Sequence, residues 1–489
     1  MTDAVATDTA ALDPRRWRAL AVLGLIQFML ILDVTVVNVA LPHIKTDLDF
    51  TDTGLAWVVD GYVLAAGGLL LLGGRLSDIL GRQRTFLAGV AVFALASLSC
   101  GLAQNDSVLV VSRFAQGIGE ALAAPAALGL IAVLFMDPKE RIKALGIWGG
   151  LAGLGGTSGT VISGLIVNSV SWRWIFLINL PVAAIALVTV PRLTSESRME
   201  RTHKGVDLVG AAGITGALVA LVNGFLQAAR PENTWGSTSV WLSLVVGAAL
   251  LAFFVVWESR VEDPLVPLRF FTNRTRVVTN GVTLFFSSAF FTYFFLLTLF
   301  MQQVLHYTAL KGGLAYLPFG IAIGAGIGLG TGLMPKVGVK ALLATGFLLA
   351  ALGMVLTSGI DVGGGYWSHI FPGMVVLGLG SGLSFPGFGN ASLHEVTTQD
   401  AGLASGVQNA MQQIAGAVGL AVLVTVASRH AAHLVHAGTD PVHALVKGYE
   451  LSYRVAASLL AAGAVAVVLL LQHVDPVPRQ PEAEVAAAG

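Results

Sequence analysis

This chain is short of cysteine and of charged residues, and each shortage excludes a class of protein. Cys100 is the only cysteine in 489 residues, so no intramolecular disulfide can form and a cysteine-rich metal site is excluded. Lys, Arg, Asp and Glu together make up only 11% of the residues, whereas 55% are hydrophobic. A soluble globular domain carries about 25% charged residues. The composition therefore predicts an integral membrane protein.

Two motifs that would indicate an enzyme are also missing. The chain has no G-x-x-x-x-G-K-[ST] phosphate loop through which ATP could power it, and no H-E-x-x-H zinc helix. Its 28 basic and 28 acidic residues balance, which gives no support for nucleic acid as a partner. We therefore expect no enzymatic activity, no cofactor, no metal site and no nucleic-acid partner.

Long apolar runs, by contrast, are abundant. A helix crosses the hydrocarbon core of a bilayer with about 20 apolar residues. Fourteen runs qualify, at residues 17–40, 53–73, 85–103, 107–135, 142–167, 174–190, 206–229, 237–257, 277–304, 312–334, 341–359, 370–390, 401–427 and 451–471. No small-residue cleavage pattern follows the first run, so we interpret it as an anchor rather than a signal peptide. The sequence predicts an all-α membrane protein with both termini on one side.

The basic residues indicate which side that is. Most Lys and Arg residues lie in segments on the side of the N-terminus, for example Arg15, Arg82, Lys139, Arg198 and Arg274. Positive charge marks the cytoplasmic loops of membrane proteins. We therefore expect both termini in the cytoplasm.

The runs divide into two halves with an extra pair between them, because the stretches flanking the seventh and eighth runs are the most charged in the chain. A weak echo between residues 74–84 and 332–340, each after the second run of its half, supports the repeat. Repeated halves are typical of secondary transporters, which bind substrate where the halves meet. The predicted domains are a cytoplasmic tail (1–16), a six-helix bundle (17–191), charged linkers with two extra helices (192–273), a second six-helix bundle (274–472) and a disordered cytoplasmic tail (473–489).

A few ionisable residues interrupt the apolar runs, where a charge costs a few kcal/mol or more and is kept mainly for function. At about 1.5 Å per residue, Asp33 and Asp60 lie roughly 10 to 14 Å below the predicted outer surface. Arg113 lies at a similar depth and can neutralise one of them. Glu120 follows Arg113 by two helical turns and shares a face with Gln116. Burial favours the neutral form of a carboxyl group, as a proton carrier requires. We predict that Asp33, Asp60, Glu120 and Arg113 couple the protein to protons.

Each of these groups also has a structural interpretation. Asp33 would then hydrogen-bond Thr35 or Asn38 and hold its helix, and Asp60 would face a water-filled outer vestibule. Arg113 would form a permanent ion pair, since buried pairs are often only architectural. Glu120, two turns after Arg113, would be a buried acid whose hydrogen bonds are all satisfied by neighbouring protein groups. The sequence leaves these alternatives open.

Five short motifs occur in order along the chain. Residues 32–42 read LDVTVVNVALP, residues 74–84 fit G-x-L-x-D-x-x-G-R-x-R, and residues 113–119 fit R-x-x-Q-G-x-G. The motifs SWRWIFLINLP and DPLVPLR follow at 171–181 and 263–269. Together they resemble the major facilitator superfamily, specifically its fourteen-helix drug:proton antiporter branch, over nearly the whole chain.

This resemblance implies a fold and a function. The fold would be the major facilitator fold, with two six-helix bundles plus two extra central helices. The function would be export of hydrophobic, cationic drugs or antiseptics across a bacterial cytoplasmic membrane in exchange for protons, by alternating access and as a monomer. The partners would be a lipophilic small molecule, protons and the lipid bilayer. Alternatives are an exporter of one endogenous metabolite, lipid or antibiotic, and a membrane sensor that does not transport.

Further candidate residues fall into two groups. Substrate-binding candidates are polar and aromatic residues of the runs, whose alternative role is to join helices or face lipid: Glu120, Asp33, Gln116, Asn38, Trp57, Tyr62, Trp148, Tyr293, Asn409 and Gln412. A cytoplasmic latch would use glycines for tight turns and charges that pair with helix ends in one conformation: Gly74, Asp78, Gly81, Arg82 and Arg84. Positive charge that only orients the chain would explain these arginines but not Asp78.

The fifth run departs from the antiporter pattern. Family antiporters usually read G-P-x-x-G-P-x-x-G-G there, whereas this chain reads GGTSGTVISG at 155–164, without either proline. Proline kinks a membrane helix, so the departure bears on antiport. Gly155, Gly159 and Gly164 remain and permit close helix packing.

Four histidines lie in the predicted outer loop before the last run, at 430, 433, 436 and 443. A spacing of three on a helix would suit a metal-binding or pH-sensing face. An ordinary polar loop is the alternative, because no residue supplies a clear fourth ligand. We predict no metal site.

Overall fold

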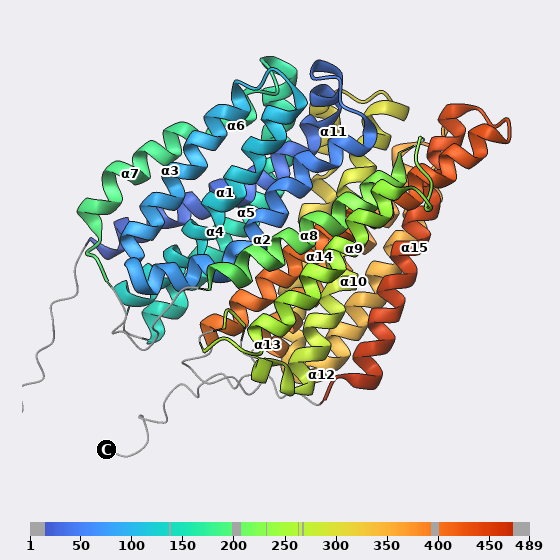
Figure 1. The fold of residues 1–489 in the computed structure, drawn as a ribbon. Coiled ribbons are helices and arrows are strands. Elements are labelled where there is room, and N and C mark those ends of the chain that lie inside the picture. Colours follow the sequence, from blue (N-terminus) through green and yellow to red (C-terminus); the bar gives the residue numbers. More distant parts are fainter. Residues whose placement is uncertain are drawn as a thin grey trace, which may run out of the picture.

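The computed structural model describes residues 15–135, 138–197, 207–230, 232–262, 264–266, 268–392 and 401–472. These residues form helices joined by short turns and contain no strand, which confirms the all-α prediction (Figure 1). In order, the elements are α1 (Arg16–Asp47), α2 (Asp52–Leu80), α3 (Arg82–Gly101), α4 (Asp106–Leu134), α5 (Pro138–Ser169), α6 (Trp174–Leu177), α7 (Asn179–Leu193), α8 (Leu208–Ala229), α9 (Thr238–Glu258), η1 (Leu268–Thr272), α10 (Arg274–Leu299), η2 (Phe300–Val304), α11 (Ala309–Ala315), α12 (Leu317–Thr357), η3 (Tyr366–Ile370), α13 (Phe371–Ser392), α14 (Ala401–His436) and α15 (Pro441–Leu470).

Twelve helical stretches of the described chain are long and apolar enough to cross a membrane. One of them, Ala309–Thr357, has 49 residues, which is far more than the roughly 20 that a bilayer needs. α5 has 32 residues and is not among the twelve. The long stretch therefore needs a closer look before the spans are counted.

α12 consists of two antiparallel arms joined at Gly338. This residue has φ 79° and ψ 162°, outside the helical region and in a range that favours glycine. Along the first arm, positions 319–330 meet positions 378–386 of α13 in ascending order. Along the second arm, positions 343–357 meet positions 373–387 in descending order. The chain therefore reverses direction at Gly338. Dividing α12 there and including α5 gives fourteen spans, which is the count we propose.

With this division, the helix directions define two sides of the molecule. We call the side where α1 begins and α15 ends the terminal side, and the opposite one the distal side. Gly81, which links α2 to α3 on the terminal side, also has a positive φ of 112°. Gly81 and Gly338 follow the second span of their respective halves, so the weak sequence echo corresponds to the same kind of turn in both.

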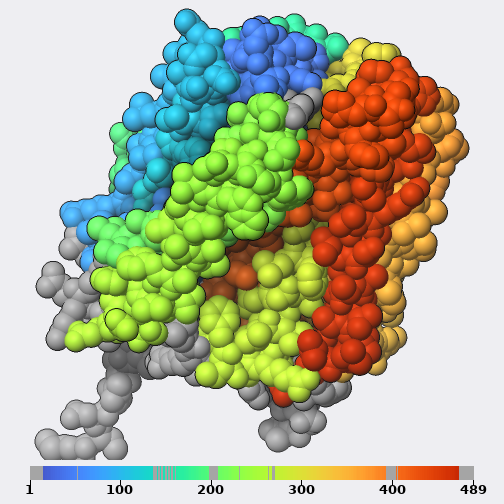
Figure 2. All heavy atoms as spheres, turned by 45° about the vertical axis from the view of Figure 1, so that its right-hand side comes forward, coloured from blue at the N-terminus to red at the C-terminus, as the bar shows by residue number. Residues whose placement is uncertain are grey.

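The helices form two groups with a hairpin across the seam. Figure 1 shows the N-terminal helices, blue to cyan, on one side of the molecule and the C-terminal helices, yellow to red, on the other. α8 packs against α2 from the first group and α14 from the second. Figure 2 shows the α8–α9 pair on the surface between the N-terminal helices and α15. We propose these groups as the two six-helix bundles, with α8 and α9 as the extra pair.

α9 contacts little besides α8, and its sides carry large apolar residues. Only 11% of its most apolar 18-residue segment is buried inside the protein, and Trp241, Leu242 and Phe253 are exposed. An exposed apolar surface of this length is more stable in contact with lipid than with water. The hairpin thus presents a lipid-facing surface beside the seam.

The two bundles touch on the distal side. The Gln302 Nε2 atom in η2 donates a hydrogen bond to the Val39 carbonyl oxygen in α1 at 2.8 Å. Gly164 in α5 packs against the backbone of Ala309 in α11, where a Cβ would lie 2.7 Å from the carbonyl oxygen. Two other glycines face α1: Gly155 lies against the Phe28 carbonyl oxygen and Gly159 against the Thr35 side chain. These three predicted packing glycines of the fifth run therefore lie at helix contacts, and one of the contacts joins the two bundles.

Several predicted boundaries were too short. α2 continues to Leu80 rather than ending at residue 73, and α14 continues to His436 rather than ending at 427. Pro42 lies inside α1, which runs on to Asp47. The predictions stopped where the apolar run stopped, whereas a helix continues beyond the hydrocarbon core as long as its backbone hydrogen bonds can form.

Gly73, rather than Gly74, is the glycine on which the packing of α2 against α4 depends. A Cβ on Gly73 would overlap the carbonyl oxygen of Ala121, whereas a Cβ on Gly74 would lie 3.7 Å from the Pro125 side chain, an ordinary contact. We expect Gly73→Ala to lower the free energy of unfolding by roughly 1–3 kcal/mol. Gly74→Ala is the matched control and should be neutral or stabilising by up to about 1 kcal/mol. Thermal unfolding of the two variants in detergent tests this, and equal stability would contradict it.

Candidate functional site

The best-defined polar group inside the bundle is an ion pair between α1 and α4. The Arg113 guanidinium donates to the Asp33 carboxylate at 2.5 Å, and the two side chains are 1% and 0% exposed. The residues are 80 positions apart in the sequence. Two opposite charges without water attract strongly, and leaving either alone would be costly. We predicted that Arg113 neutralises one of the two aspartates, and in this structure its partner is Asp33.

Neutral polar side chains complete the shell around Asp33. Gln116 donates to its Oδ1 at 3.2 Å, and Asn179 donates to the same atom at 2.7 Å. Ser97 accepts from both amides, at 3.0 and 2.9 Å. Asp33 therefore receives donors from α4 and α7 as well as the guanidinium. The alternative in which it bonds Thr35 or Asn38 was wrong.

Arg113 is held from several directions. Its Nε donates to the Val58 carbonyl of α2 at 2.8 Å, and its Nη1 also donates to Gln116 at 2.8 Å. Its guanidinium carbon lies 4.2 Å from the centre of the Tyr62 ring, a cation–π contact. The arginine thus links α1, α2 and α4. A change in the charge of Asp33 would act on all three helices.

Asp60, in the same helix as Tyr62, has quite different surroundings. The residue is completely buried, and neither carboxyl oxygen has a hydrogen-bond partner among the described residues. Its interpretation as a residue of a water-filled outer vestibule was therefore wrong. An ionised carboxylate buried without any partner is very unstable, which makes Asp60 a candidate for binding a proton.

Glu120 lies on the same helix as Arg113 and is 7% exposed. It interacts electrostatically with both Asp33 and Arg113, and its carboxyl group lies near the Tyr62 hydroxyl. One of its carboxyl oxygens, Oε2, has no hydrogen-bond partner among the described residues. Glu120 is therefore part of the Asp33–Arg113 neighbourhood, as the common helix face predicts.

The remaining substrate-binding candidates do not form one site. Asn409 and Gln412 line the same cavity in the C-terminal bundle. Asn38 donates to the Val34 carbonyl of its own helix at 3.2 Å. Trp57 packs against Phe114 with ring centres 6.0 Å apart. These positions separate the candidates into an N-terminal cluster, a C-terminal cavity and residues used in packing.

Two further aromatic candidates belong to the packed interior. Tyr293 is completely buried and contacts the rings of Phe319 and Tyr453, at 6.2 and 6.0 Å between centres. Trp148 is partly buried against the hydrophobic core. We retain both as proposed substrate contacts only for a conformation in which the bundles have moved.

The predicted latch is built differently from its prediction. Gly74 lies inside α2, so its assignment to a tight turn was wrong, whereas Gly81 forms the turn. Arg82, the first residue of α3, pairs at 3.4 Å with Asp78 near the end of α2, across the Gly81 turn. The N-terminus of α3 is instead capped by a residue that the sequence reasoning missed. Glu196, after α7, accepts hydrogen bonds from the backbone amides of Gln83 and Arg84, both at 3.1 Å.

The Glu196 cap ties the end of the N-terminal bundle to the start of α3. A carboxylate at a helix N-terminus satisfies free amides and interacts favourably with the helix dipole, and the Arg84 side chain adds an ion pair at 3.6 Å. We expect Glu196→Ala to lower the free energy of unfolding by roughly 0.5–2 kcal/mol. Exposed Glu262 supplies the control substitution. The check is thermal unfolding at two salt concentrations, and no difference between the two variants would contradict the capping role.

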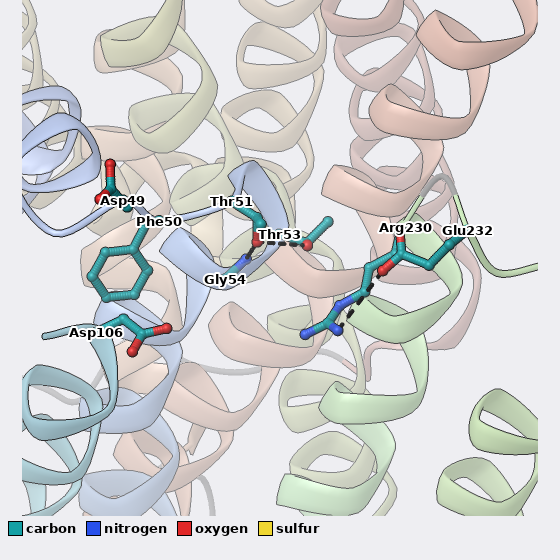
Figure 3. A pocket seen from close by; sticks show the side chains of 8 residues that line it. All are labelled: Asp49, Phe50, Thr51, Thr53, Gly54, Asp106, Arg230 and Glu232. Carbon is teal, nitrogen blue, oxygen red and sulfur yellow. Dashed lines mark hydrogen bonds and ion pairs between the residues drawn. The ribbon is translucent and has the colours of Figure 1, made fainter.

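A small pocket of about 200 Å³ lies on the distal side, between the α1–α2 connection, the start of α4 and the end of α8. Figure 3 shows Arg230 reaching from α8 toward Thr53, with Asp49 and Asp106 on the other side of the pocket. Arg230 also lies 3.9 Å from Glu232. The pocket brings charges of both signs to the rim where the hairpin meets the N-terminal bundle.

The four histidines do not form a metal site. Three of them lie on the last turns of α14 and not in a loop, and His443 forms a hydrogen bond with Asp440 at 2.9 Å in the first turn of α15. This bond holds the pKa of exposed Asp440 below its usual value. No group of three or more potential metal-binding side chains occurs in the part of the chain that the structure describes.

Comparison with known families decides the identity. The family model of the Major Facilitator Superfamily matches residues 23–420, most of the chain. The chain belongs to the major facilitator superfamily. The resemblance noted in its motifs is therefore confirmed.

Relatives within the superfamily match this transporter over most of their lengths. It is 38% identical to the puromycin resistance protein of Streptomyces alboniger over 466 residues, which cover 94% of this chain and 92% of the relative. It is also 38% identical to the lincomycin resistance protein of Streptomyces lincolnensis, covering 96% and 94%. The probable actinorhodin transporter of Streptomyces coelicolor is 36% identical, covering 84% and 72%.

Solved structures confirm the major facilitator fold. A bacterial homologue of the human lysosomal transporter Spinster, crystallised in an inward-facing, unoccupied conformation, matches with a TM-score of 0.65 and 16% identity, covering 94% of this chain and 97% of that one. An auto-inhibited peptide transporter of the POT family matches with a TM-score of 0.68 and 14% identity, covering 94% and 99%.

Sequence reasoning on this superfamily member missed Ser97, Asn179 and Glu196. Asn179 lies in the motif at 171–181, so its position was noted but its role was not. Ser97 and Glu196 carried no signal, because a serine in an apolar helix and a glutamate in a charged linker are both common. Only the packing of helices distant in sequence gives these residues their partners.

Proposed function

We propose that this chain is a proton-coupled secondary transporter that exports hydrophobic drugs or antibiotics from the cytoplasm by alternating access. Its relatives are named for resistance to puromycin and lincomycin and for actinorhodin transport, which supports drug export. One observation supports the proton coupling: Asp60 is completely buried, and neither of its oxygens is hydrogen-bonded to a residue that the structure describes. A transporter can use such a group to carry a proton, because exposure to water on either side releases it.

The mechanism uses the two aspartates in different ways. In this mechanism Asp33 pairs with Arg113 in the present conformation, whereas Asp60 is the group that carries a proton. Protonation of Asp33 from outside would free the guanidinium and loosen the contact between α1 and α4. Because Arg113 keeps its charge, the freed guanidinium favours a conformation in which it finds another anion or water. We assign Glu120 to the binding of cationic substrates, close to this switch.

We propose that the chain lies in the bacterial cytoplasmic membrane with both termini in the cytoplasm. The distribution of Lys and Arg supports this orientation. The terminal side is then cytoplasmic, the distal contacts between the bundles close the outer side, and the Glu196 cap lies on the inner face. We also propose that one chain suffices, because both halves of the transport path lie within it.

A second function is favoured by one specific observation. Relatives that match over nearly the whole chain are named for single antibiotics rather than for many. A narrow range, with one antibiotic or metabolite as the natural substrate, is therefore the alternative. It shares the mechanism above and differs in how selectively the cavity binds.

Flux in proteoliposomes tests the proposed function. An imposed proton gradient should drive transport of ethidium and of puromycin by the wild type, and Glu120→Gln should reduce cation transport at least tenfold. Glu232→Gln, an exposed change on the distal loop, serves as the control. Wild-type flux that ignores the gradient would overturn proton coupling. Transport of puromycin without ethidium would favour the narrow substrate range.

A further inference from the structure

A second cavity, on the terminal side, lies between α13 and α14 in the C-terminal bundle. Its volume is about 350 Å³, enough for one small ring system and within the usual range of ligand pockets. Residues that line it include Phe385, Phe388, Gly389, Gln408, Asn409 and Gln412. None of these side chains is charged, in contrast to the acidic cluster of the N-terminal bundle.

Gln408 lines this cavity and has a buried carbonyl oxygen. The residue is 6% exposed, and its Oε1 has no partner among the described residues. Its Nε2 donates to the Thr283 hydroxyl oxygen at 2.8 Å, and that hydroxyl donates to the Thr279 carbonyl oxygen at 2.8 Å. Because this threonine hydroxyl donates to the backbone, it accepts from the Gln408 amide nitrogen, which leaves the Gln408 carbonyl oxygen as the atom without a described partner.

The opposite wall of the cavity is aromatic and held in place. Phe388 and Phe385 contact the Phe286 ring, with centres 5.3 and 5.9 Å apart, and Phe388 also contacts Phe347 at 5.8 Å. Rings fixed by such neighbours present a rigid flat surface at low entropic cost. Phe388 is only 2% exposed, so a flat aromatic ligand would stack against the partly exposed ring of Phe385.

Gly389 keeps the cavity open. A Cβ at this position would meet no atom within 4 Å. The residue lies within α13, where alanine or leucine is a better helix former than glycine. A larger side chain there would therefore fill space without disturbing the packing of the helix.

We propose that this cavity is a binding subsite for exported substrates that are flat, aromatic and carry an N–H or O–H donor, with Gln408 as the acceptor. The inference rests on the proposed export function and names its substrate class. A buried acceptor left unpaired disfavours ligands that lack the donor. Selection at this subsite is by shape and hydrogen bonding, while charge is handled by the acidic cluster of the other bundle.

A matched pair of probes tests the proposal. Acridone is flat, neutral and fluorescent and has one N–H donor, whereas 10-methylacridone has nearly the same shape without it. Saturable binding of each is measured by fluorescence to the full chain in nanodiscs, with empty nanodiscs subtracted. The variants are Gln408→Leu, Gly389→Leu and the control Gly328→Leu, an exposed helical glycine of α12 whose Cβ would also meet nothing within 4 Å.

We expect the wild type and Gly328→Leu to bind acridone at least about fivefold more tightly than 10-methylacridone. Gln408→Leu should abolish this preference, and Gly389→Leu should weaken the binding of both probes. Equal wild-type affinities, a preference that survives Gln408→Leu, or no saturable binding of acridone would each overturn the subsite. Gradient-driven ethidium flux is measured on the same protein preparations after reconstitution into proteoliposomes. If the wild type prefers acridone but shows no gradient-driven ethidium flux, the export function is contradicted, whereas the binding site is still supported.

Discussion

Replacing Asp33 with asparagine is expected to abolish gradient-driven export and to destabilise the protein. The substitution leaves the Arg113 guanidinium, only 1% exposed, without its anion. Removing one partner of a buried ion pair typically costs about 3–5 kcal/mol. Flux in proteoliposomes measures the first effect and thermal unfolding in detergent, followed by tryptophan fluorescence, measures the second.

A double variant separates transport from folding. Asp33→Asn combined with Arg113→Gln removes both charges and should recover most of the lost stability, because replacing a whole buried pair by neutral groups is often nearly neutral. Transport should remain absent, since no group is left at this position to bind and release a proton. Asp361→Asn, at an exposed carboxylate outside the bundles, is the control. Gradient-driven export by the double variant would contradict a proton role for Asp33.

Replacing Asp60 with asparagine should have the opposite profile, with stability preserved and coupling lost. Asparagine imitates the protonated carboxyl group in size and charge, and Asp60 has no partner to lose among the described residues. We expect the free energy of unfolding to change by less than about 1 kcal/mol, as for a substitution that breaks no interaction. Accumulation of ethidium against its gradient should fall at least tenfold.

Exchange of substrate across the membrane distinguishes lost coupling from a blocked path. A variant fixed in the neutral form can still change conformation, so counterflow of labelled against unlabelled substrate should continue in Asp60→Asn. Uphill accumulation and counterflow are measured on the same preparation of the Asp60→Asn variant, so the two activities can be compared directly. Unchanged uphill accumulation would show that Asp60 is not a proton carrier, and loss of counterflow as well would show that it holds the path open.

The depth of the ionisable groups could be predicted from the sequence, but their partners could not. Asp33, Asp60 and Arg113 were placed at similar depth by counting residues from the ends of the apolar runs. In the structure, Arg113 pairs with Asp33 alone. Counting gives the height of a residue along its helix, whereas pairing depends on which way the side chain points around the helix axis. That rotation is set by packing against neighbours.

The glycines show the same division. The motif at 74–84 made Gly74 a candidate for a turn, yet it lies inside α2 and has ordinary space around it. Its neighbour Gly73, which no prediction named, is the one at which the α4 backbone leaves no room for a Cβ. A glycine has no side chain whose pattern could reveal its role, so only the approach of another backbone identifies the one that matters.

The sequence alone determined that this is a helical membrane protein, where most of its apolar runs lie, and which ionisable residues are buried among them. These are local properties, because hydropathy and the free energy of burying a charge act residue by residue. The tertiary structure decided that Asp33 is paired whereas Asp60 has no partner among the described residues, that Glu196 caps α3, and that Gln408 lines a cavity. These depend on which helices meet and on their rotation, and both follow from contacts between residues far apart in the chain.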